Sequence, residues 1–208
     1  MKIKKLGLLG VPVLALAAVL PLSATAGGAQ HVSWDIVSVS PIPIAPPPPV
    51  TFNPDGVASA HTPEGTTITL TGSGTFVAPD GSNGGSGAVT GGGNWWTFDA
   101  AGGPTGSGTY EVKELVAWQF ASAQPLLIGG FPVTDNTGDT TKRANGVAVL
   151  RIEFSDGASG VLTVGCHGPG APAGIFEGIA TTKGFTTYYN VPAPPANANE
   201  GRTLFHVR

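Results

Sequence analysis

Apolar and polar residues alternate along much of the chain, which is the period of a β-strand with one buried face. The clearest case is Gly146–Ser155, whose alternate residues are Ala148, Leu150, Ile152 and Phe154. A turn sequence, Asp156-Gly157, follows this segment, and Val161–Cys166 then alternates in the same way. The pattern therefore predicts an antiparallel hairpin at this point.

Further strands are predicted by the same pattern in seven other segments, each bounded by glycine, proline or aspartate. They are His31–Ser40, Thr66–Gly72, Trp95–Phe98, Thr109–Phe120, Gly174–Thr181, Phe185–Tyr189 and Thr203–Val207. Glycine is costly inside helices, whereas threonine, valine and aromatic residues favour strands. The sequence therefore predicts an all-β fold, a single antiparallel β-barrel of about 8–10 short strands. A β-sandwich is the alternative.

Proline and glycine divide the chain between these strands. The proline-rich run at 41–49 predicts an extended polyproline segment, which is either a strap on the sheet or a linker. The run Gly81–Gly93 predicts a flexible glycine-rich loop. We expect a signal peptide at 1–26, an N-terminal strand with the proline-rich strap at 27–50, and an antiparallel β domain at 51–208.

The first 26 residues have the order of a secretory signal peptide. Three lysines precede an uncharged apolar run, Leu6–Leu22, and Ala24-Thr25-Ala26 supplies a small-x-small cleavage site. A retained membrane anchor is the alternative, but the run is short for a span and contains Pro12 and Pro21. We therefore predict a secreted or periplasmic protein, bacterial because it can form no intrachain disulfide.

Charge and cysteine content narrow the classes of partner. The full chain carries 10 basic and 13 acidic residues, and the three lysines of the signal peptide leave 7 basic residues and a net charge of −6 after cleavage. Such a chain is a poor candidate for nucleic acid or for an anionic membrane surface. Cys166 is the only cysteine, so a hydrophobic core must hold the mature chain without a disulfide.

Two acidic residues on predicted strands are the candidate catalytic groups. Glu114 and Glu177 both fall on apolar faces, and a carboxylate is costly to bury unless it is paired or functional. Lys183 and His167 are the groups we expect to support them in proton transfer. The alternative for Glu114 is a β-bulge at Lys113–Leu115 that turns it outwards. For Glu177, the alternative is that Phe176, Gly178 and Ala180 form the core face, which places Glu177 on the opposite face of the strand.

Aromatic residues are the candidate ligand-binding groups. Trp95-Trp96 and Tyr188-Tyr189 are adjacent pairs of rings. In each pair one side chain must point away from the other, and an exposed ring can stack on a sugar or a flat ligand. The alternative is that one ring of each pair fills the core and the other packs under the glycine-rich loop. The predicted ligand-binding residues are Trp95, Trp96, Trp118, Tyr188, Tyr189 and Arg151.

The remaining chemical groups predict no metal site and no cofactor. Cys166 shares an apolar strand face with Leu162 and Val164, which predicts a buried, inert thiol rather than a nucleophile. The histidines have no ligand-pair spacing, and we expect surface or turn positions for them: His31, His61, His167 and His206. The loop Asp135–Asp139 predicts an ordinary Asx turn, with calcium as the alternative.

The leading functional hypothesis is non-catalytic binding of a small apolar or aromatic ligand, or of a surface polysaccharide, in a barrel mouth. In size and strand content the chain is similar to eight-stranded small-ligand barrels, lipocalin-like or dirigent-like, without a shared motif. One alternative is a small-molecule cyclase, isomerase or hydrolase using the inward carboxylates. Another is a structural or adhesive surface protein, and assembly into an oligomer stays open.

Overall fold

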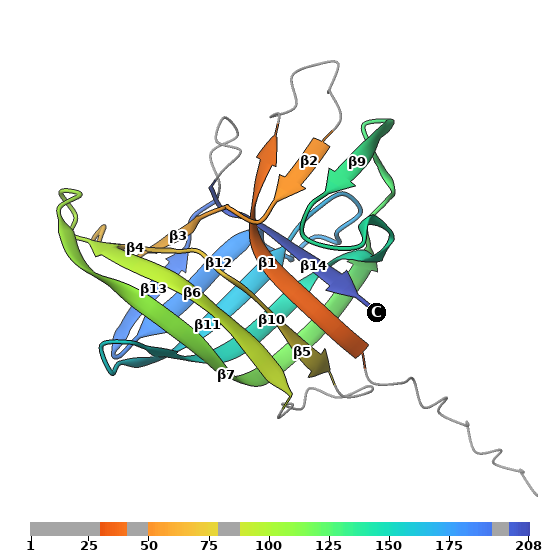
Figure 1. The fold of residues 1–208 in the computed structure, drawn as a ribbon. Coiled ribbons are helices and arrows are strands. Elements are labelled where there is room, and N and C mark those ends of the chain that lie inside the picture. Colours follow the sequence, from red (N-terminus) through yellow and green to blue (C-terminus); the bar gives the residue numbers. More distant parts are fainter. Residues whose placement is uncertain (1–29, 41–49, 79–87, 193–199) are drawn as a thin grey trace, which may run out of the picture.

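A computed structural model describes residues 30–40, 50–78, 88–192 and 200–208, and these residues form an all-β fold (Figure 1). The described part contains fourteen strands, one 3-10 helix and no α-helix. None of its helices is long and apolar enough to cross a membrane. The predicted signal peptide and the proline-rich segment at 41–49 lie outside the described residues. Residues 81–87, the first part of the predicted glycine-rich loop, also lie outside them.

The strands and the 3-10 helix η1 have the following bounds: β1 Gln30–Ser40, β2 Val50–Asn53, β3 Ala58–His61, β4 Thr67–Leu70, β5 Ser73–Ala78, β6 Val89–Phe98, β7 Pro104–Ala123, β8 Leu127–Ile128, β9 Phe131–Asp135, η1 Thr140–Lys142, β10 Arg143–Phe154, β11 Ser159–Cys166, β12 Gly178–Lys183, β13 Thr186–Asn190 and β14 Arg202–Val207.

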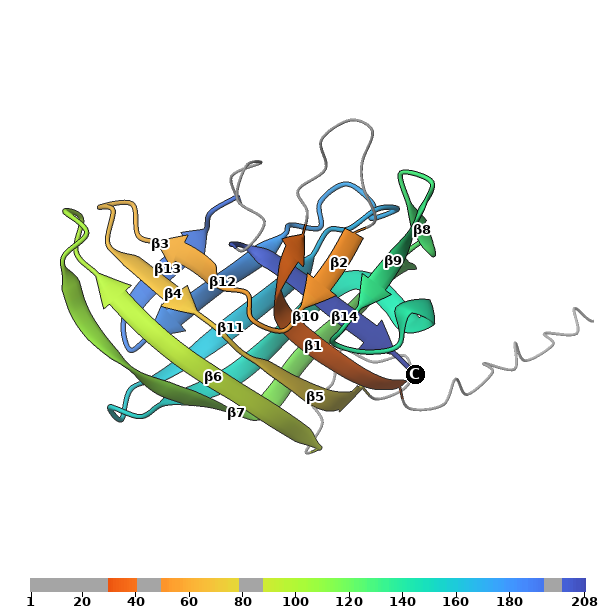
Figure 2. The ribbon, with the colours of Figure 1, turned by 45° about the horizontal axis from the view of Figure 1, so that its top comes forward.

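These strands form one large sheet with the order β11-β12-β13-β3-β4-β6-β7-β10-β14-β1-β2-β9-β8. Strand β5 lies outside this path and pairs with both β1 and β6, and β11 also pairs with β10. The sheet is mixed rather than purely antiparallel as predicted, because β2 and β9 are parallel (Figure 2). The predicted hairpin is confirmed, since β10 pairs antiparallel with β11 and places Leu150 opposite Leu162.

The long strand β7 departs from simple alternation because its pairing with β10 is interrupted by register shifts. Leu150 pairs with Leu115, but Arg151 pairs with Glu114 and Ile152 with Val112, so one extra residue, Lys113, is inserted in β7. Such a bulge turns the residues beyond it to the opposite face. Leu115 is consequently buried, and Glu114 lies on the outer face.

The core is formed by aliphatic residues and by aromatic rings that meet edge to face. The Trp118 ring lies 5.4 Å from that of Phe76 and 4.7 Å from that of Phe205. The predicted glycine-rich loop is wrong for Val89–Gly93, because this stretch begins β6. Gly91 has a φ of +135°, and a Cβ at this position would lie 2.6 Å from the Ser73 carbonyl oxygen, so only glycine lets β6 approach β5 this closely.

Strands β1 and β14 form an antiparallel pair that places two different sites at its two ends. At one end Ser33 is paired with His206, and beyond the other end of the pairing Val39 continues β1 opposite Phe52 of β2. Residues 34–38 of β1 are all buried, so both faces of this strand are covered. Buried polar residues of β1 and β14 must therefore find partners inside the protein.

Candidate functional site

A cavity of about 240 Å³ lies beside the first residues of β14. Its apolar lining comes from β1, β2, β8, β14 and the loop after β11. Its polar lining comes from β14 and from residues close to the ends of β7, β11 and β12. The apolar residues are Val39, Val50, Phe52, Ile128, Pro169 and Leu204; the others are Gln124, Cys166, His167, Gly168, Glu177, Arg202 and Thr203. We call this site the Glu177 cavity.

Glu177 occupies the loop position immediately before β12, and two backbone N–H groups bind its carboxylate. The N–H of Thr203 donates to Oε1 over 2.8 Å, and the N–H of His167 donates to Oε2 over 2.5 Å. Burial raises the pKa of Glu177 to about 7, although these two hydrogen bonds and the nearby charge of Arg202 act to lower it. Glu177 therefore changes charge close to neutral pH.

His167 follows β11 directly and lines the same cavity. Its Nδ1 lies 2.6 Å from the Ile175 carbonyl oxygen. A carbonyl can only accept, so Nδ1 carries the proton and Nε2 remains the acceptor of the neutral ring. Two predicted site residues, Glu177 and His167, are thus brought together, but through the His167 backbone rather than its ring.

The inner wall of the cavity is a buried hydrogen-bonded network that includes the predicted inert thiol. Cys166 is only 1% exposed, and burial raises its pKa well above the ordinary value. The Gln124 Nε2 donates to the Cys166 Sγ over 3.3 Å, while Arg143 donates to the Gln124 Oε1 and, over 2.6 Å, to the Pro125 carbonyl. These contacts fix the wall, and they leave Cys166 without the lowered pKa of a reactive thiol.

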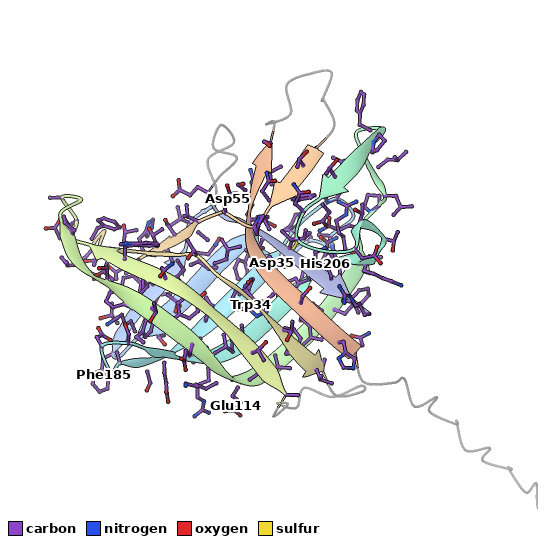
Figure 3. All side chains as sticks on the ribbon, in the orientation of Figure 1. Trp34, Asp35, Asp55, Glu114, Phe185 and His206 are labelled. Atoms are coloured by element: carbon purple, nitrogen blue, oxygen red, sulfur yellow. The ribbon has the colours of Figure 1, made fainter. Side chains whose placement is uncertain are left out.

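Two predicted catalytic residues, Glu114 and Lys183, do not line this cavity. Glu114 forms an ion pair with Arg151 on the outer face, with 3.0 Å between Oε2 and Nε, and the bulge in β7 is the reason. Figure 3 shows Glu114 at the margin of the molecule. Lys183 lies at the far end of β12, where it binds Asp156 and its Nζ lies 4.4 Å from the centre of the Trp95 ring. The expected pairing of Glu114 with Glu177 is therefore wrong.

The predicted aromatic residues also lie outside the cavity lining. As expected, the rings of each adjacent pair point to opposite faces: Trp95 and Tyr188 are buried, whereas Trp96 and Tyr189 are 36% and 56% exposed. Trp118 is part of the core, and its indole N–H donates to the Gln30 Oε1. None of the rings predicted to bind a ligand therefore contributes to the Glu177 cavity.

A second polar cluster was missed in the sequence, and we call it the His206 cluster. His206 is fully buried, so its predicted surface position is wrong. Its Nε2 lies 2.8 Å from the Asp135 Oδ2, and its Nδ1 lies 3.4 Å from the Ser33 Oγ. Asp35 lies close by (Figure 3), and burial raises its pKa to about 6, with the His206 charge opposing and the Asp135 charge adding to the shift.

The only sequence signal for this cluster was the position of His206 between buried strand residues of β14. The loop after Asp135 does form the predicted Asx turn, with Oδ1 accepting from the Thr137 backbone N–H over 2.9 Å. Among the described residues there is no group of three or more histidine, cysteine or acidic residues that could hold a metal ion. The chain matches no protein-family model, and comparisons with curated proteins and with solved structures found no match.

Proposed function

We propose that this protein binds a small, mainly apolar molecule with one hydrogen-bond donor in the Glu177 cavity. The observation that carries the proposal is a single carboxylate set among apolar walls. Small-ligand sites combine such walls with a few placed polar groups. The apolar body of the ligand would lie against Val39, Phe52 and Leu204, and its donor would bind the Glu177 carboxylate.

The proposal takes the sheet as a closed barrel. Because β11 pairs with β10, the hydrogen-bonded pairs form a ring: β10, β11, β12, β13, β3, β4, β6, β7 and β10 again. A closed barrel of this size has an interior filled by side chains or by one small ligand. The Glu177 cavity lies where the ends of three ring strands, β7, β11 and β12, meet β1, β2, β8 and β14, which are not part of the ring. The signal-peptide pattern at 1–26 adds the proposal that the ligand is met outside the cytoplasm.

A second candidate function is proton transfer to or from the bound molecule by Glu177. The observation that favours it is the pKa of about 7, since a general acid or base works best when its pKa is near the operating pH. His167 lines the same cavity and is the residue that would relay the proton to solvent, because it is exposed.

Titration with the fluorescent probe N-phenyl-1-naphthylamine, an apolar amine, tests binding. We expect saturable enhancement with the full chain, and an affinity at least ten-fold lower in Val39→Phe, which fills the cavity. Val161→Phe is the matched control, since Val161 is 37% exposed and lies outside the cavity lining. Equal affinity in both variants, or no saturable binding by the folded wild type, would overturn the proposal.

A further inference from the structure

Ser33, His206 and Asp135 come from three separate strands and form a continuous hydrogen-bonded chain. Ser33 of β1 is directly opposite His206 of β14, and Asp135 ends β9. The Ser33 Oγ lies 3.4 Å from one ring nitrogen of His206, and the Asp135 Oδ2 lies 2.8 Å from the other. A hydroxyl, an imidazole and a carboxylate in this order are the three parts of an activated serine nucleophile.

The contacts of Asp135 fix the proton on His206. Burial acts to raise the Asp135 pKa, but the hydrogen bonds from His206 and from Thr137 hold it below its ordinary value. The Oδ1 atom accepts from the Thr137 N–H, the Thr137 hydroxyl and the Gly138 N–H. An ionised carboxylate can only accept, so Nε2 of neutral His206 carries the proton and Nδ1 presents a lone pair to Ser33.

Ser33 is the member of the chain that can meet a substrate. It is partly exposed and lines a cavity of about 450 Å³, whereas His206 lies fully buried behind it. His31 and Arg208 line the same cavity and are its basic residues. A charged donor near the reacting carbonyl stabilises the oxygen on which negative charge develops.

We propose that Ser33, His206 and Asp135 form a nucleophilic triad that hydrolyses small carboxylic esters. The Ser33 Oγ forms a bond to the ester carbonyl carbon, and its proton passes to the His206 Nδ1. The carbon–oxygen bond to the alcohol then breaks, and the alcohol leaves with that proton. Water then attacks the carbonyl carbon of the acylated Ser33 and gives its proton to the same nitrogen. The bond to the Ser33 oxygen breaks, the acid is released, and the proton returns to restore the Ser33 hydroxyl. Asp135 stays ionised and orients the ring.

This proposal goes beyond ligand binding and uses different residues. The Glu177 cavity is lined by Val39 of β1 and by residues 202–204 of β14, whereas the triad uses Ser33 and His206. Glu177→Gln should therefore leave esterase activity unchanged, and Ser33→Ala should leave probe binding in the Glu177 cavity unchanged. Ester hydrolysis and ligand binding can therefore be disproved independently of each other.

Covalent labelling of the full chain with a fluorophosphonate tests the nucleophile. We expect a single adduct, mapped to Ser33 by peptide mass spectrometry, and hydrolysis of p-nitrophenyl acetate that falls at least 100-fold in Ser33→Ala. Ser159→Ala is the matched control, because Ser159 is an exposed serine that lies outside the lining of this cavity. It should label and hydrolyse like the wild type.

Folding of each variant is checked by its near-ultraviolet circular dichroism. A folded wild type that gives no adduct at Ser33, or a Ser33→Ala variant that hydrolyses the ester at the wild-type rate, would overturn the proposal.

Discussion

The Glu177 cavity and the His206 cluster each bury a carboxylate near a histidine, yet they hold it in opposite ways. Glu177 accepts two backbone N–H groups, and its pKa rises to about 7. Asp135 accepts from three local donors and from the His206 ring, and its pKa falls below the ordinary value. Burial alone therefore does not set the charge of a carboxyl; the number and nature of its donors decide whether desolvation is offset.

The two sites consequently predict opposite responses to pH. A carboxyl with a raised pKa stabilises the folded state at low pH and loses that contribution as pH rises through the folded pKa. A carboxyl with a lowered pKa contributes stability above its ordinary pKa and loses it as pH falls through the folded pKa. Glu177 acts between its ordinary 4.5 and about 7, whereas Asp135 acts below 3.8.

The largest effect is expected for Asp135→Asn. It removes the charged partner of the fully buried His206 and places an amide where four donors now converge. We expect a loss of about 3 kcal/mol in the free energy of unfolding, measured by urea titration at pH 7. Asp139→Asn, in the same loop but exposed, is the control and should leave the free energy of unfolding close to that of the wild type. Equal effects would show that the His206 pair contributes nothing.

The pH dependence of Glu177 comes next. Between pH 5 and pH 8 the wild type should lose about 2 kcal/mol through this group, because it must then be buried as a charge. Glu177→Gln should remove that part of the loss, as urea unfolding at both pH values would show. Asp35, whose pKa is about 6, adds a loss of the same sign at lower pH, so Asp35→Asn separates the two. An unchanged slope in Glu177→Gln would contradict the raised pKa.

Alanine substitutions at two glycines compare the rigidity of the sites. A Cβ on Gly138 would lie 2.8 Å from ring atoms of His206, and one on Gly168 would lie 2.5 Å from the Gln124 amide nitrogen. The ring is held at both nitrogens, whereas an amide at the end of a longer side chain can shift. We expect Gly138→Ala to cost about 1.5 kcal/mol and Gly168→Ala less, by thermal unfolding. The reverse order would indicate that the Gln124 network is the stiffer one.

The smallest effect is expected for Glu114→Gln. Its ion pair with Arg151 lies on the outer face, with the Glu114 side chain 46% exposed. Exposed ion pairs contribute little, so we expect a change below about 0.5 kcal/mol in urea unfolding and no change in probe binding. A marked loss of probe binding would show that Glu114 contributes to the binding site, and it would contradict the outer-face position that the bulge in β7 gives it.

Local pattern was enough to predict much of the fold but little of the sites. Alternation in Gly146–Ser155 predicted β10 and its buried face, because β10 keeps one register with β11 and its buried residues alternate. For Glu114 it left two positions open, and the bulge considered at Lys113–Leu115 is confirmed; whether it forms depends on how β7 pairs with β10. Local pattern failed for Val89–Gly93, where composition indicated a loop but close packing of β6 against β5 requires glycine.

What the sequence by itself determined is the all-β class, the central hairpin, the buried state of Cys166 and the division of each adjacent aromatic pair between two faces. These follow from the two-residue period of a strand, which is a local property. Only the tertiary structure decided which polar groups meet. Ser33 and His206 are 173 positions apart, and no local pattern records a pairing that strand order alone creates.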